Sequence, residues 1–189
     1  MQNNPLIFLF IDNYHLDLLS ALKKNINLIY RNYDNKIDAN SIKKLQTFCR
    51  KTNRKFFIAN NYKLAFNLNL DGVYLPSFNK RLNIIGKSKR KNFKVIGSAH
   101  NIKEIKIKKN QGCELIFLSP IFKTKKKNSY LGVVKFNFLT INYSIKFIAL
   151  GGISEKNFKK IRLTKAIGIA GISKINQIKK TAQYKIGPF

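Results

Sequence analysis

The sequence has only two cysteines, Cys49 and Cys113, and they lie far apart along the chain. Such a pair offers neither a disulfide framework nor the clustered thiols of a zinc site, so we expect two reduced, mostly buried thiols. Long apolar runs are also missing: the longest, such as Leu6 to Ile11 and Ile145 to Leu150, have the length of a strand rather than a membrane span. The first five residues lack the charged start and apolar core of a signal peptide. We therefore expect a cytoplasmic protein without a membrane partner.

Acidic residues are scarce as well, eight against 37 Lys and Arg, which gives a formal net charge of +29. A charge of this size favours contact with nucleic-acid phosphates. However, the basic residues are 31 Lys and only 6 Arg, spread over the whole chain, whereas forked recognition of phosphates and base edges favours Arg. The 23 Asn, together with Lys, Ile, Phe and Tyr, are encoded by A/T-rich codons, so we attribute much of the charge to genomic base composition. We expect only nonspecific nucleic-acid binding, with steering of an anionic substrate as a by-product.

Short apolar runs alternate with amphipathic segments along all 189 residues, which is typical of parallel βαβ units in a single domain, 1–189. We expect eight strands, at Leu6–Ile11, Leu28–Arg31, Lys55–Ala59, Gly72–Leu75, Val95–Ser98, Leu115–Ser119, Phe147–Leu150 and Ile167–Gly171. Helices are predicted at Asp38–Thr52, Asn101–Gln111, Glu155–Leu163 and Lys174–Tyr184, and a loop or lid at Thr124–Val134. Eight such strands predict an α/β fold, a compact (β/α)8 TIM barrel with short loops.

Two glycine-rich turns follow the last two predicted strands. The first ends the run from Phe147 to Ser154, and the second ends the run from Gly168 to Ser173. An apolar strand that opens into small residues before a helix presents free backbone amides, which favour an anion. Two such units in succession match the phosphate clamp after strands 7 and 8 of a (β/α)8 barrel. The sequence therefore predicts a phosphorylated small-molecule ligand.

The motifs at the ends of the predicted strands resemble those of the thiamine-phosphate synthase and TenI (thiazole tautomerase) family over most of the chain. They are Leu28 to Arg31, Leu64 to Leu75, Ile96 to His100, Leu118 to Thr124, Leu150 to Ile153 and Gly168 to Ser173. The resemblance implies a barrel with its site at the carboxyl ends of the strands and a thiazole phosphate as ligand. It implies that backbone amides at Gly151, Gly152, Ile172 and Ser173 bind the phosphate, and that the Thr124 hydroxyl and Lys127 contact the substrate. It also places Ser98 near a pyrimidine site.

The chain departs from the family pattern where the synthase binds Mg²⁺ and pyrophosphate. Two family aspartates fall on Asn60 and Asn79, or on Asn61 with a one-residue shift, and neutral amides bind Mg²⁺ weakly. The Gln-x-Arg-x-Lys signature of the pyrophosphate pocket survives only as Ile29, Arg31 and Tyr33. We therefore predict no metal site. If the chain is a synthase, we expect Mg²⁺, with Asn60, Asn79 or Asp71 as weaker ligands.

What remains of the family's chemistry is the thiazole-phosphate site and His100. The resemblance to TenI implies that this histidine moves a proton, a role that suits its near-neutral titration. Arg31, at the end of the second strand, is a candidate for binding a substrate carboxylate or phosphate, or for pairing with Asp12 or Asp34. We favour metal-independent tautomerisation by His100. The alternative is the synthase, which joins the thiazole phosphate to a pyrimidine diphosphate, and the second alternative is a basic ligand- or RNA-binding protein without catalysis. A homodimer is left open.

Overall fold

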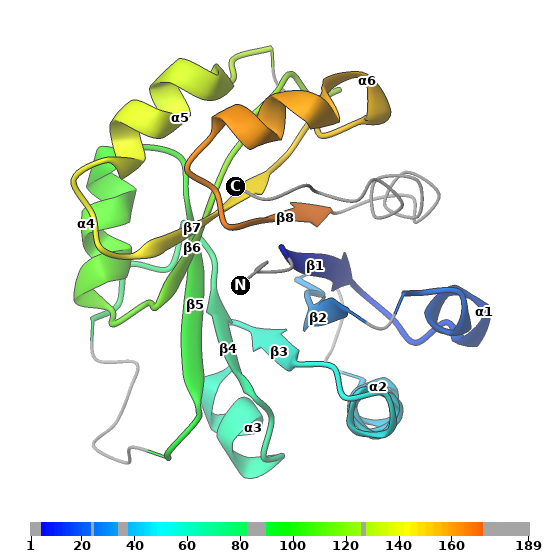
Figure 1. The fold of residues 1–189 in the computed structure, drawn as a ribbon. Helices are drawn as coiled ribbons and strands as arrows, with labels where there is room; N and C mark the ends of the chain where they lie inside the picture. The colour runs from blue at the N-terminus through cyan, green and yellow to red at the C-terminus, as the bar shows by residue number, and fades with distance from the viewer. Residues whose placement is uncertain (1–4, 24, 34–37, 83–89, 126–127, 172–189) are drawn as a thin grey trace.

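A computed structural model of the chain describes residues 5–23, 25–33, 38–82, 90–125 and 128–171. Eight parallel strands follow one another around a closed barrel, and the last pairs with the first (Figure 1). This arrangement confirms the predicted (β/α)8 barrel. The strands are β1 (Leu6–Ile11), β2 (Ile26–Tyr30), β3 (Phe56–Ala59), β4 (Gly72–Leu75), β5 (Lys94–Ala99), β6 (Leu115–Leu118), β7 (Lys146–Leu150) and β8 (Gly168–Gly171).

The helices lie outside the strands, as Figure 1 shows. They are α1 (Leu16–Ser20), α2 (Ala39–Lys51), α3 (Tyr62–Asn67), α4 (Ile102–Asn110), α5 (Gly132–Thr140) and α6 (Glu155–Phe158), and α6 runs into a 3-10 turn, η1 (Lys159–Leu163). The predicted ends of α2 and α4 are confirmed, because Asp38 and Asn101 cap their first turns with side-chain oxygens. The predicted helix at Lys174–Tyr184 lies outside the described residues.

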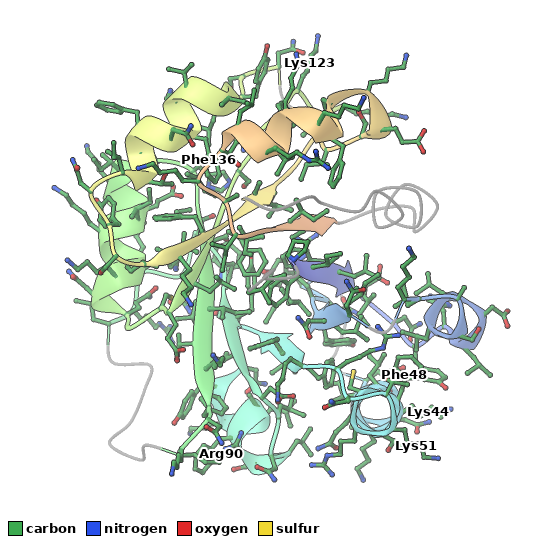
Figure 2. All side chains as sticks on the ribbon, in the orientation of Figure 1. Lys44, Phe48, Lys51, Arg90, Lys123 and Phe136 are labelled. Carbon is green, nitrogen blue, oxygen red and sulfur yellow. The ribbon has the colours of Figure 1, made fainter. Side chains whose placement is uncertain are left out.

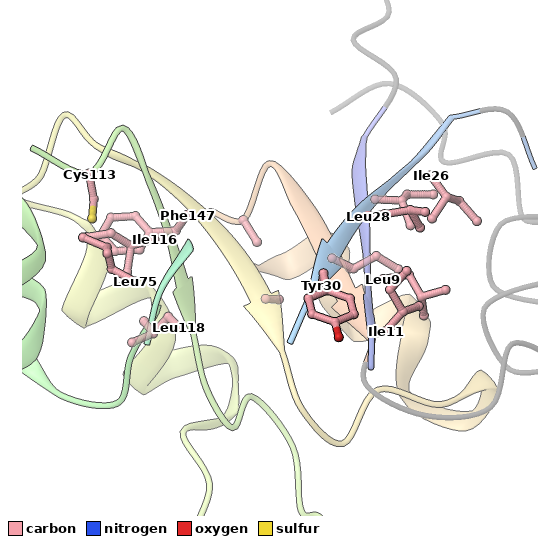
Figure 3. Close-up of a cluster of buried hydrophobic side chains, with 14 of the residues drawn as sticks. Leu9, Ile11, Ile26, Leu28, Tyr30, Leu75, Cys113, Ile116, Leu118 and Phe147 are labelled. Carbon is pink, nitrogen blue, oxygen red and sulfur yellow. The ribbon is translucent and has the colours of Figure 1, made fainter. Parts of the chain in front are cut away.

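Side chains alternate between two apolar layers along each strand, as the period of a strand requires. Phe8 and Phe10 of β1 point into the barrel, where Phe8 packs edge-on against Phe117 with ring centroids 5.0 Å apart. Their neighbours Leu9 and Ile11 face outwards and pack with the buried faces of the helices (Figure 3). The barrel interior is therefore a packed aromatic core that closes the floor beneath any site at the strand ends.

The predicted loop at Thr124–Val134 is wrong at its end, because α5 begins at Gly132. The amide of Leu131 donates to the Pro120 carbonyl at 2.9 Å, which starts the helix beside β6. The buried Phe136 then fixes the helix against the barrel (Figure 2). The sequence does not predict that α5 begins here, because the preceding residues are Lys-rich and the helix itself starts with a glycine. The helix is stabilised instead by burial of Phe136, four residues later.

Among the described residues, no helix is both long enough and apolar enough to cross a membrane. Both cysteines are free and buried, Cys49 on α2 and Cys113 just before β6.

Candidate active site

The carboxyl ends of five strands surround a cavity of about 320 Å³, a size typical of a small-molecule site. Its lining comes from the segments after β2, β4, β5, β6 and β7. The lining residues are Arg31, Tyr33, Tyr74, Pro76, Ser77, Phe78, Ser98, His100, Ser119, Pro120, Thr124, Leu150 and Gly151. This is the end of a (β/α)8 barrel where ligands bind. The structure thus brings Arg31, Ser98, His100, Thr124 and Gly151 together, as the sequence predicts.

The turn after β7 has a backbone that only glycine adopts easily. Gly151 and Gly152 have φ angles of 91° and 73°. A Cβ atom on Gly152 would lie 2.3 Å from the Phe122 carbonyl oxygen, so the turn can lie against the β6 loop only without a side chain there. The amides of Gly152 and Ile153 donate to no other described residue. Of this turn, Gly151 lines the cavity, so the turn lies at its edge.

His100 is held in one orientation by Glu104, a residue that the sequence analysis does not single out. Glu104 Oε2 lies 2.9 Å from His100 Nδ1 and accepts the His100 backbone amide at 2.8 Å. Asn101 caps α4 through the Glu104 amide, which places the carboxylate one turn from the ring. Because a carboxylate only accepts, Nδ1 is the donor in this contact, and Nε2 is the ring nitrogen that Glu104 does not contact. The signal in the sequence is the spacing of four residues from His100 to a first-turn glutamate.

Aromatic and cationic side chains line the same cavity as His100. The Arg31 guanidinium stacks over Phe10 at 4.7 Å and lies 5.9 Å from the ring centre of Tyr33. Tyr33 in turn packs edge-on against Phe78 at 5.4 Å, and burial raises the pKa of Tyr33 to about 12. In the described residues Arg31 makes no ion pair with Asp12, and Asp34 lies outside them. Arg31 lines the cavity, so its guanidinium is a candidate for binding an anionic ligand.

Ser98 lies deeper, at the end of β5. Its side chain lies near that of Tyr74, and burial raises the pKa of Tyr74. Both side chains line the cavity, so this pair forms a polar floor in an otherwise apolar barrel core. Thr124 lines the opposite side, beside Gly151.

The two family metal positions hold amides that bind each other. Asn79 Nδ2 donates to Asn60 Oδ1, and Asn79 Oδ1 accepts the Arg81 amide at 3.0 Å. Asn61, the alternative, caps α3 by accepting the Leu64 amide. Neutral oxygens that already have partners do not fit a Mg²⁺ site, which requires hard anionic ligands. Within the described ranges, no group of three or more His, Cys, Asp or Glu residues could hold a metal ion.

Asp71 cannot serve as the weaker metal ligand that the sequence allows. It precedes β4 at the amino end of the barrel, where it pairs with Lys55 at 2.9 Å and accepts the Phe56 amide. The cavity lies at the carboxyl ends, so the strand separates the two. Ile172, Ser173 and Lys127, also predicted to bind substrate, lie outside the described residues.

A family model described as thiamine monophosphate synthase matches residues 16–175 of this chain. The chain belongs to the thiamine-phosphate synthase/TenI family. The predicted resemblance is thus confirmed over most of the sequence.

Curated relatives of this family member are named thiamine-phosphate synthase. The chain is 34% identical to that of Prochlorococcus marinus strain SARG over 172 residues, covering 85% of this chain and 47% of the relative. It is 32% identical to that of Pelagibacter ubique over 167 residues, covering 82% and 77%. The chain thus spans about half the length of the Prochlorococcus relative. Among solved structures, thiamine phosphate pyrophosphorylase from Pyrococcus furiosus matches with a TM-score of 0.72 and 17% identity, covering 96% and 93% of the two chains, which supports the fold.

These names agree better with the synthase alternative than with the tautomerase that the sequence analysis favours.

Proposed function

We propose that this chain is an enzyme of thiamine-phosphate synthesis that binds a thiazole phosphate at the mouth of the barrel and joins it to a pyrimidine diphosphate. The observation that carries the proposal is the glycine turn after β7, whose Gly151 lines the same cavity as Arg31. The names of the curated relatives support the condensation, which releases pyrophosphate.

Each site residue is assigned a part of the substrates according to its chemistry. The Gly151–Gly152 turn offers backbone donors to the thiazole phosphate, joined by Ile172 and Ser173 as the family resemblance implies. Arg31 offers a forked cation to the diphosphate. Thr124 and Lys127 complete the phosphate side, and Ser98 orients the pyrimidine through its hydroxyl. Because Asn60 and Asn79 do not fit a bound Mg²⁺, neutralising the leaving group falls to cationic side chains.

Tautomerisation of a thiazole phosphate is the second candidate, and the His100–Glu104 pair favours it. The pair holds a ring nitrogen that Glu104 does not contact beside the cavity, the arrangement that general acid–base catalysis needs. His100 would move the proton that brings an exocyclic double bond into the aromatic thiazole. This reaction needs neither Mg²⁺ nor a second substrate.

One assay separates the two candidates. The purified chain is incubated with thiazole phosphate and hydroxymethylpyrimidine diphosphate, with Mg²⁺ or with EDTA, and thiamine phosphate is quantified. Product formation that an Arg31→Met substitution reduces at least tenfold supports the condensation. Isomerisation of the thiazole phosphate alone, without thiamine phosphate under either condition, rejects it in favour of the second candidate.

We further propose that residues 1–189 act as one catalytic unit, since one barrel supplies every described residue of the cavity. A homodimer remains a proposal that sedimentation would test.

A further inference from the structure

Lys108 of α4 is fully buried, although lysine is among the residues least often found inside a protein. In the described part of the chain, no carboxylate lies within ion-pair distance of its ammonium group. Instead the Nζ atom donates to the carbonyls of Pro76 and Asn79, at 2.8 and 2.7 Å, and to Gln111 Oε1 at 2.8 Å. All three of its donors are thus used.

Gln111, at the end of the same helix, completes this network. It is also buried, and its Nε2 donates to the carbonyls of Asn79 and Arg81, at 3.1 and 2.7 Å. Both amide protons and the amide oxygen therefore have partners. A buried polar network with every donor satisfied is rigid, whereas a partly satisfied one would cost stability.

The barrel wall is adapted to the lysine stem. Gly97 of β5 lacks a side chain where the stem passes, and a Cβ atom there would lie 2.8 Å from Lys108 Cδ. Cys113 lines the same passage and packs near Leu75 and Ile116 (Figure 3). Burial lowers the pKa of Lys108 to about 8, so the group is still mainly protonated at neutral pH.

The network holds the segment after β4, which forms one wall of the active-site cavity. The carbonyls of residues 76, 79 and 81 turn towards α4, and Pro76, Ser77 and Phe78 line the cavity. Asn79, whose side chain binds Asn60, lies in the same turn. A buried ion that well-packed apolar residues could replace is often kept because it specifies a conformation.

We propose that Lys108, with Gln111, is the positioning residue that fixes the β4 wall of the active site, an internal cation in a wall whose Asn60–Asn79 pair does not fit a metal. This inference deepens the proposed function. It also makes a structural claim that holds whichever reaction the cavity performs.

The test compares Lys108→Met with Lys109→Met, which removes the same charge from an exposed neighbour on the same helix. Hydrogen exchange of the peptide spanning residues 76–82 is measured without substrate. We expect faster exchange in this peptide for Lys108→Met, with the amides of β1 and β7 unchanged, and no change for Lys109→Met. Added Mg²⁺ should not restore protection.

Activity supplies the second readout. In the thiamine phosphate assay we expect Lys108→Met to have a KM at least tenfold higher than the original chain and a kcat within threefold of it. The reason is that the wall binds substrate without touching the reacting atoms. If Lys108→Met fails to fold, Gln111→Leu keeps the ammonium and removes two carbonyl contacts, and it should loosen the same peptide. Equal exchange in Lys108→Met and Lys109→Met, or unchanged exchange in Gln111→Leu, would overturn the inference. If the original chain forms no thiamine phosphate, the proposed function is refuted, but the hydrogen-exchange result still tests the role of Lys108.

Discussion

At the scale of single residues, the contact between His100 and Glu104 carries the proposed proton transfer. The Glu104 carboxylate holds the ring through both Nδ1 and the His100 backbone amide, the arrangement that general acid–base catalysis would use. We expect His100→Asn to lower any thiazole isomerisation by about a hundredfold or more, the usual loss of a general acid–base group. Condensation should fall by less than tenfold. Steady-state rates of both reactions provide the measurement. Glu104→Gln keeps the shape of the side chain without its charge, and its isomerisation rate should lie between those of His100→Asn and the original chain.

Cys49 gives a prediction about pH. Burial raises the pKa of its thiol from 9.0 to about 12, so the unfolded chain loses this proton at lower pH than the folded chain. The folded state therefore binds more protons between pH 9 and 12, and stability falls as the pH rises through that window. For one thiol the loss is roughly 1.4 kcal/mol at pH 10 relative to pH 8. Urea denaturation at both pH values should show a smaller decrease for Cys49→Ala, and an equal decrease would contradict the assignment.

At the scale of elements, the strands are where sequence reasoning works best. A buried parallel strand is a short apolar run, and all eight strands lie within two residues of their predicted ends at each side. The six-residue helix α3 is not among the helices named from the sequence, because it is too short to show a helical period. Caps explain the success at α2 and α4, where Asp38 and Asn101 mark the first turn chemically.

The site residues also divide into those that the sequence predicts and those that it does not. Residues in a strand-end motif, such as Arg31, Ser98 and Gly151, are predicted because their position along the chain fixes their place in the barrel. Glu104 and Lys108 are not predicted, since their roles depend on which side chains a helix brings across the wall. The Tyr33–Phe78 contact likewise joins two loops far apart in sequence.

The two ends of the strands should also differ in what a substitution does. Asp71, at the amino end of β4, ties β3 and β4 together through Lys55 and the Phe56 amide. We expect Asp71→Asn to lower the free energy of unfolding by about 1 kcal/mol, with kcat and KM within twofold of the original. Chemical denaturation and the steady-state assay check this together. A change in the response to Mg²⁺ would instead show that Asp71 reaches the active site.

At the scale of the whole molecule, the sequence has a formal net charge of +29, and Lys44, Lys51, Arg90 and Lys123 lie at the periphery of the described structure (Figure 2). We expect binding of nucleic acid to be independent of sequence and to weaken steeply with salt, because counterion release drives it. Fluorescence anisotropy with two unrelated RNA oligomers at 50 and 200 mM salt measures this. A preference of tenfold or more for one oligomer would support the non-catalytic RNA-binding alternative.

Phosphate binding by the turn after β7 is most directly tested by calorimetric titration of thiazole phosphate into the original chain and into Gly152→Ala. The added methyl group would lie 2.3 Å from the Phe122 carbonyl oxygen, so the turn must move and its backbone amides change their orientation. We expect saturable binding to the original chain and an affinity at least thirtyfold lower for the folded variant. Equal affinity in the two proteins, or no binding to either, would contradict phosphate recognition by this turn.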